Sequence, residues 1–159
     1  MKFKRLPLTE LQKLEKEFVQ FLASNTITAD DWQKLQKDSR AKADELVDMF
    51  SDIVYQKVME KIEYIEFRTS HEMKQFKCGK EQFEMIGLTV MPEVPVDLRK
   101  GEDLAKLNDY AHQISIFHGT KNYDPNREEE IFKMMDAGAM KTDGRLYGLL
   151  EKLYSKNKD

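Results

Sequence analysis

Apolar residues recur at steps of three and four through much of the first 66 residues, which is the pattern of amphipathic helices. Thr9 and Gln12 have the spacing of a capping box, so a first helix is predicted to begin there. Leu14 and Phe18 belong to its apolar face, and the helix is predicted to end at Ser24.

A stronger helix start lies in the run ITADDW. Thr28 is the predicted N-cap, and Asp31 stands at the third helical position, where its carboxylate can complete a capping box. Ile27 and Trp32 occupy the two positions of a hydrophobic staple. The run therefore predicts the N-terminus of a second helix.

The apolar stripe of this second helix continues to Ile65, which is very long for one helix of a globular protein. The polar run QKDSR, residues 36–40, interrupts the stripe. We therefore predict a break or bend at this run. The helical part of the chain is expected to cover residues 8–66.

The residue pattern changes between Met73 and Val90. The runs MKQFKC and FEMIGLTV read as two strands around a turn that contains Gly79, which predicts a β-hairpin. Two prolines and several charged residues follow, as is typical of a sheet edge or a linker. A short helix is expected from Glu102 to Tyr110.

The run AHQISIF is ambiguous by period, but its isoleucines favour a third strand from residue 111 to 118. His112, Ile114, Ile116 and His118 would then share one face of that strand, and Gly119 would form a turn. The two histidines would lie as much as ~20 Å apart, at ~3.3 Å per residue. They are too far apart to share a metal ion, whose ligands lie ~2 Å from it.

Two helices are predicted near the C-terminus. The first begins near Asp124–Pro125, is capped by Asp124 or Asn126, and carries glutamates in its first turn. It is expected to end at Gly138, and Thr142 is expected to cap the second helix. Together these helices occupy about residues 125–155.

These elements predict an α+β fold that is mainly helical. It has a helical N-terminal half, a small antiparallel sheet in the middle (hairpin and third strand, about residues 73–118), and a C-terminal helix pair. A chain of 159 residues is long enough to bury a core, and we expect a single domain that spans residues 1–159.

Two runs carry a resemblance to a known family: FLASNTITADDW, from Phe21 to Trp32, and REEEIFKMMDAGAM, from Arg127 to Met140. They resemble a family of small soluble bacterial proteins that is classed as a domain of unknown function. The resemblance covers nearly the whole chain. It implies one intact domain and brings no activity, substrate or catalytic residue.

Charged residues make up 35% of the chain, the formal net charge is −3, and acidic and basic residues are mixed along the sequence. No basic half exists that could follow a phosphate backbone. We expect no signal peptide and no membrane span, because no apolar run is long enough. With a single cysteine there is no intrachain disulfide, and a cytoplasmic protein is expected.

The run DPNREEE resembles the start of a calcium-binding EF-hand loop, with Asp124, Asn126 and Glu128 at alternate positions. The sixth position of such a loop requires glycine and the twelfth a bidentate glutamate, but these positions hold Glu129 and Met135. A helix N-terminus explains the run better, because acidic side chains complement the helix dipole there.

Cys78 could be a reactive thiol if it were exposed, because neighbouring lysines would lower its pKa. A free cysteine is more often a small buried hydrophobic residue, and no second cysteine is present to form a CxxC pair. A metal- or thiol-dependent enzyme remains an alternative if the fold brings the candidate side chains together. The candidates are His71, Cys78, His112 and His118.

Signatures of nucleotide-binding loops and of serine hydrolases do not occur in the sequence. We therefore expect a non-enzymatic interaction or regulatory protein, without a cofactor or metal, that binds a protein partner through an amphipathic helical face. A second alternative is an RNA- or ribosome-associated protein that uses Lys2, Lys4, Arg5 and the lysines of the hairpin. The sequence leaves the oligomeric state open.

Overall fold

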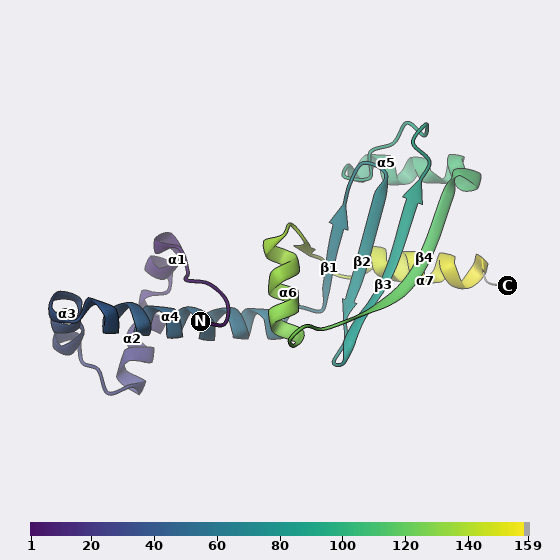
Figure 1. The fold of residues 1–159 in the computed structure, drawn as a ribbon. Coiled ribbons are helices and arrows are strands. Elements are labelled where there is room, and N and C mark those ends of the chain that lie inside the picture. The colour runs from purple at the N-terminus through teal and green to yellow at the C-terminus, as the bar shows by residue number, and fades with distance from the viewer. Residues whose placement is uncertain (158–159) are drawn as a thin grey trace. The chain divides into compact units, whose positions relative to one another are not determined.

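The computed structural model describes residues 1–157, which form two compact units that divide between Glu60 and Lys61 (Figure 1). The predicted α+β, mainly helical class is confirmed. The expectation of a single domain stays a prediction. The first unit contains four helices: α1 (Leu8–Lys13), α2 (Glu15–Ser24), α3 (Ala29–Asp38) and α4 (Arg40–Glu60).

The first predicted helix is in fact two short helices, α1 and α2, which meet at Leu14. Pro7 stands at the N-cap position of α1, so Thr9 lies inside the helix and the predicted Thr9–Gln12 capping box is wrong. Proline suits a helix start because the backbone donor that it lacks would have no partner in the first turn.

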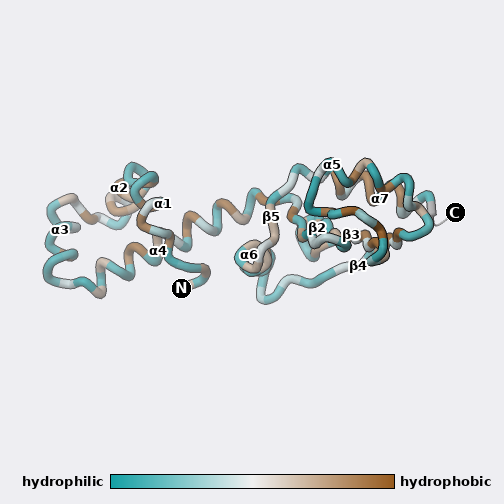
Figure 2. Tube along the Cα trace, turned by 90° about the horizontal axis from the view of Figure 1, so that it is seen from above, coloured by the Kyte–Doolittle hydropathy of each residue, from teal (hydrophilic) through white to brown (hydrophobic). Residues whose placement is uncertain are grey.

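The helix start at Thr28 is confirmed. The Thr28 Oγ1 accepts a hydrogen bond from the Asp31 backbone N–H at 3.1 Å, and the Asp31 carboxylate accepts one from the Thr28 N–H at 3.1 Å. The break predicted in residues 36–40 is confirmed too, because Ser39 has a non-helical φ of −144° between α3 and α4. Along α4, hydrophobic and hydrophilic positions alternate with the turns of the helix (Figure 2).

An aromatic cluster joins α2, α3 and α4 in the first unit. The ring of Phe18 meets Trp32 edge-on at 5.1 Å between centroids, and it meets Phe50 at the same distance. Phe50 is buried, and Phe21 lies 5.5 Å from it. These three of the four helices of the unit are therefore held by aromatic packing, whose edge-to-face geometry is favourable.

The second unit is built on an antiparallel sheet of five strands in the order β4-β3-β2-β1-β5. Its remaining elements are the helices α5, α6 and α7 and the 3-10 helix η1. The bounds are β1 (Tyr64–Arg68), β2 (Glu72–Cys78), β3 (Gln82–Val90), α5 (Gly101–Leu104), η1 (Ala105–Gln113), β4 (Ile114–Asn122), α6 (Arg127–Asp136), β5 (Met140–Lys141) and α7 (Arg145–Asn157).

The hairpin of β2 and β3 is confirmed, but the helical part ends at Glu60 and not near residue 66. Residues 64–68 form β1, which pairs with β2 on one side and β5 on the other. Ile65 is fully buried in this strand. The long apolar stripe concealed the change from helix to strand, because a short apolar run fits both periods.

The third predicted strand is displaced along the chain. Residues 111–113 belong to η1, so His112 is not in the strand, and β4 continues through Gly119 to Asn122. The predicted turn at Gly119 is therefore wrong. Pairing with β3 decides the length of β4, because all nine residues of β4 have a partner on β3.

Two further helix boundaries differ from expectation. Asn126 caps α6 by accepting the Glu129 N–H at 3.1 Å, as predicted, but Pro125 precedes this cap and is not part of the first turn. Gly138, with φ of +119°, follows the end of α6 as expected. Thr142 does not cap α7, and its backbone N–H donates to the Tyr64 carbonyl at 3.0 Å.

The two faces of the sheet are covered differently, with α6 on one side and α7 on the other (Figures 1 and 2). The α7 side holds a hydrophobic core, to which the loop after β3 also contributes. The buried residues of this core are Met73, Ile86, Leu88, Val90, Val94, Val96, Leu98, Tyr147 and Leu150. The opposite face is covered in part by the ten-residue helix α6.

Candidate functional site

The four candidate residues from the sequence lie at separate places in the second unit. His71 precedes β2 and its ring nitrogens lie 2.9 Å from the Ser70 Oγ and 3.2 Å from the Val94 carbonyl oxygen. Cys78 ends the same strand, ~23 Å further along it at ~3.3 Å per residue. His112 is exposed in η1 and His118 lies in β4.

His118 stacks on Tyr154 of α7, with 5.6 Å between the ring centroids. The structure therefore does not bring His71, Cys78, His112 and His118 together. Within residues 1–157, no group of three or more His, Cys, Asp or Glu side chains is placed to hold a metal ion.

Cys78 is buried, and burial raises the pKa of its thiol to about 12, although the nearby positive charge of Arg127 acts in the opposite direction. A thiol with so high a pKa is a poor nucleophile, because the thiolate is the reactive form. The geometry around Cys78 is that of a packed core residue.

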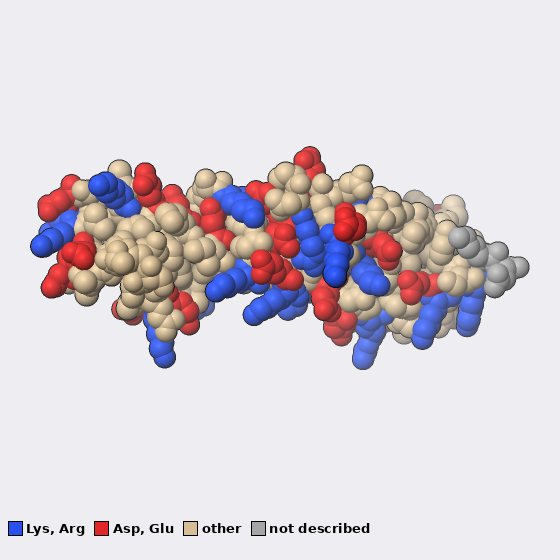
Figure 3. All heavy atoms as spheres, turned by 90° about the horizontal axis from the view of Figure 1, so that it is seen from below, with Lys and Arg blue, Asp and Glu red and all other residues tan. Residues whose placement is uncertain are grey.

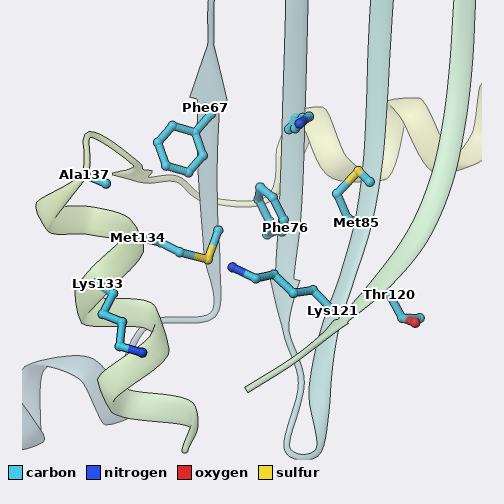
Figure 4. Close-up of a pocket in the computed structure, with 9 residues that line it drawn as sticks. Phe67, Phe76, Met85, Thr120, Lys121, Lys133, Met134 and Ala137 are labelled. Carbon is cyan, nitrogen blue, oxygen red and sulfur yellow. The ribbon is translucent and has the colours of Figure 1, made fainter. Parts of the chain in front are cut away.

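A hollow of about 480 Å³ lies between α6 and the adjacent face of the sheet (Figure 4), and we refer to it as the α6 hollow. Its floor comes from three neighbouring strands: Phe67 of β1, Phe76 of β2 and Met85 of β3. Met134 of α6 forms its side. The other lining residues are Lys74, Thr120, Lys121, Lys133 and Ala137.

The α6 hollow follows from the strand register and the shortness of α6. Phe76 pairs with Met85, so their side chains lie side by side on the same face of the sheet. Helix α6 does not cover this face completely, and Phe67 and Met85 stay half-buried while Phe76 is buried. An apolar floor of this kind, open to solvent, is typical of a binding surface.

Lysine side chains surround the apolar floor. Lys121 forms an ion pair with Glu130 at 2.6 Å, and Lys133 lies 3.6 Å from the same carboxylate. Lys74 pairs with Glu72 at 3.5 Å. The three lysine ammonium groups are thus paired with two carboxylates, those of Glu72 and Glu130. These five side chains together carry one net positive charge at the rim of the α6 hollow.

Glu130 is the buried charge of this group, and its side chain is only 9% exposed. Burial by itself would raise its pKa, but the hydrogen bond from Lys121 and the positive charges of Lys121 and Lys133 outweigh burial and lower the pKa. The carboxylate therefore stays ionised at neutral pH and holds both lysines beside the floor.

The position of α6 is fixed by Arg127 in its first turn. The Arg127 guanidinium donates to the carbonyl oxygens of Ile62 at 2.5 Å, Cys78 at 3.2 Å and Gly79 at 3.2 Å. The Tyr123 hydroxyl donates to the same Gly79 oxygen at 2.6 Å. These bonds tie α6 to the base of β1 and β2, so the α6 hollow is preformed.

The N-terminal segment that holds Lys2 and Arg5 bonds to acidic side chains of α4 within the first unit. The Lys2 backbone N–H donates to Asp52, and the Arg5 guanidinium lies 2.6 Å from Asp48 and 3.6 Å from Asp44. On the face drawn in Figure 3, basic and acidic side chains are interspersed. Neither arrangement resembles the continuous basic surface that follows a nucleic-acid backbone.

A family model matches residues 1–155 of the chain. The chain belongs to DUF6495, a family of unknown function. No curated protein and no solved structure matches it. Membership in DUF6495 confirms the resemblance found in the sequence. None of the helices in residues 1–157 has the length and apolar character needed to cross a membrane.

Sequence reasoning missed the α6 hollow of this DUF6495 chain. The signal that could have found it is the alternation in MKQFKC, which places Lys74 and Phe76 on one face of a strand. The partners of these residues, Lys121 and Met134, are distant in sequence. Only the pairing of β4 with β3 and the position of α6 bring them together.

Proposed function

We propose that this protein is a non-enzymatic binding protein whose α6 hollow receives an apolar side chain from a protein partner. The observation that carries the proposal is the preformed apolar floor of Phe67, Phe76 and Met85 beside the lysine rim. Its volume of about 480 Å³ lies within the range of ~300–1,000 Å³ found for ligand pockets.

The rim indicates the chemistry of the partner segment. Its net positive charge favours acidic residues on either side of the apolar anchor, because exposed charges steer association and select orientation. The lysines already have carboxylate partners, so the acidic residues contribute mainly to specificity, and burial of the anchor supplies most of the affinity.

A second candidate surface is the helical face expected from the sequence. Met49 and Ile53 lie one turn apart on α4 and are 49% and 41% exposed. An exposed pair of apolar residues at this spacing can bind an amphipathic helix. A binding experiment should therefore test both surfaces.

A displayed library of random peptides, selected on the full-length protein, tests the proposal. We expect the enriched peptides to contain an apolar residue flanked by acidic ones. Ala137→Phe fills the α6 hollow at an exposed position, and Lys74→Glu reverses a charge of its rim. Each should weaken binding by about tenfold or more, which corresponds to ~1.4 kcal/mol.

Lys77→Glu is the matched control, because Lys77 lies on the same strand with its side chain on the opposite face. This variant should retain binding. Peptides that bind equally well to Ala137→Phe and Lys74→Glu would refute the proposal. Loss of binding in Met49→Glu alone would assign the interaction to α4.

A further inference from the structure

We propose that β4 pairs antiparallel with β4 of a second copy of this chain, which joins two five-stranded sheets into one. The proposal concerns the free edge of the sheet and does not depend on the α6 hollow. It rests on the backbone groups of β4, on the composition of this strand, and on the reach of α7.

The backbone hydrogen bonds between the β3 and β4 segments define which groups of β4 point away from the sheet. Val90 and Ile114 are the last pair of the β3–β4 ladder, and Met91 and Gln113 form the next pair in the same register. The Met91 N–H donates to the Gln113 carbonyl at 3.0 Å, so this next pair is a hydrogen-bonded one. Bonded and non-bonded pairs alternate in an antiparallel ladder. Ser115, Phe117, Gly119 and Lys121 therefore bond to β3, and the backbone groups of Ile114, Ile116, His118, Thr120 and Asn122 point outward.

β4 is the edge strand at one end of the order, so its outward groups have no strand beside them in the described part of the chain. Natural proteins protect such edges with charges, proline or a bulge. Residues 114–120 contain no proline, Asp, Glu, Lys or Arg, and the register with β3 is continuous. The first charged residue is Lys121, near the end of the strand.

Helix α7 extends past this edge. It contacts β1 through Tyr147, whose ring lies 5.6 Å from that of Tyr64, and β4 through the stacked pair Tyr154 and His118 (Figure 1). The helix continues for three residues beyond Tyr154, which is ~4.5 Å at ~1.5 Å per residue. This length is close to the ~4.8 Å spacing of strands, so the end of α7 lies beyond the edge, where the α7 helices of two paired copies would come close to each other.

The same side of the molecule exposes apolar surface. Leu149 and Leu153, one turn apart on α7, are 51% and 47% exposed. Leu153 adjoins Tyr154, which lies over β4. A strand added to β4 would therefore gain backbone hydrogen bonds at the edge, and the exposed leucines of α7 would lie near the α7 helix of the second copy.

A second copy of this chain fits the edge because the edge is compatible with itself. A two-fold axis would place residues 114–120 of both copies opposite one another, and no like formal charges would meet. Leu153 of each copy would add apolar surface to the same interface. Two-fold dimers with such self-complementary interfaces are the commonest soluble oligomers.

Sedimentation equilibrium of the full chain tests the pairing. Wild type is expected to dimerise reversibly. Thr120→Pro removes an outward N–H and leaves the bonds to β3 in place, and Gly119 before it tolerates the conformation that proline requires. Thr120→Pro and Leu153→Glu should both be monomeric with wild-type circular dichroism, while the control Thr120→Val should remain dimeric.

Spin labels define the geometry. Single cysteines are introduced at Ser115, His118 or Thr120 in a Cys78→Ala background and then spin-labelled. In an antiparallel pair, the distance between the two labels should increase by ~7 Å for each residue that separates the label from the two-fold axis, because both labels move by the rise per residue. A wild-type monomer at ~1 mM would overturn the proposal, and so would a dimer that survives both Thr120→Pro and Leu153→Glu. An extended peptide that binds β4 of a monomeric protein would instead make a different protein the partner.

Discussion

Gly87 of β3 lies directly beneath the ring of Phe117 on β4, its partner in the strand register. A Cβ atom added at Gly87 would lie 2.1 Å from the Phe117 Cζ and 2.3 Å from its Cε2. Carbon atoms in good contact are ~3.5–4.0 Å apart, so Gly87→Ala must displace the ring by roughly 1.5 Å. We expect a loss of ~1–3 kcal/mol in the free energy of unfolding, the usual cost of overpacking.

The sign of this effect should reverse when the ring is removed. The three atoms nearest to the added Cβ all belong to Phe117. In a Phe117→Ala background, Gly87→Ala should therefore stabilise the protein by ~0.5–1 kcal/mol, because glycine in a strand costs conformational entropy. The double-mutant cycle should give a coupling free energy of at least ~1.5 kcal/mol.

Urea unfolding of the four proteins of this cycle, followed by far-UV circular dichroism, measures both effects. The m-values must agree before the free energies are compared. Equal destabilisation by Gly87→Ala in both backgrounds would show that the ring does not govern this position, and the cross-strand argument would fail.

Four other outcomes follow from the structure. Thr28→Ala should cost ~0.5–2 kcal/mol, measured by guanidinium unfolding with Trp32 fluorescence, and an unchanged midpoint would contradict the capping role. The hydrogen bond from the Thr28 backbone is the main reason why the pKa of Asp31 is lowered from its ordinary value of 3.8. The Asp31 carboxylate therefore stabilises the fold above pH 3.8, and this stabilisation is lost as the pH falls through the lowered pKa. An NMR titration that finds an ordinary pKa for Asp31 would refute this. The Cys78 thiol should react slowly with a thiol reagent at pH 8 in native protein and rapidly in denaturant, and rapid native labelling would show that it is accessible. Arg127→Ala should lower the free energy of unfolding by at least ~1.5–3 kcal/mol, because it removes charged hydrogen bonds to three carbonyl groups. Thermal or urea unfolding measures this change, and a stability equal to that of wild type would show that α6 is held in another way.

Local signals in the sequence predicted the elements that short-range interactions determine. The Thr28 capping box, the break before Arg40 and the hairpin around Gly79 all depend on residues close together in the chain. The class of fold followed from them. Where a start signal competed with a better one nearby, as Pro7 does with Thr9, the prediction failed.

The elements that long-range pairing determines could not be predicted in the same way. Ile65 fits a helical stripe as well as a strand, and only its partners on β2 and β5 decide between them. The length of β4 likewise comes from β3. The α6 hollow depends on strand pairing and on Arg127, so the alternation in MKQFKC could indicate only the part of the floor that lies on β2.

The division of the chain at Glu60 gives each compact unit a natural reporter. The only tryptophan, Trp32, lies among the aromatic rings of the first unit, and the only cysteine, Cys78, lies in the sheet of the second. Emission and thiol protection can therefore be followed on the unmodified chain as denaturant increases. Coincident transitions would mean that the units unfold as one cooperative system, and separate transitions would mean that each unit has its own free energy of unfolding.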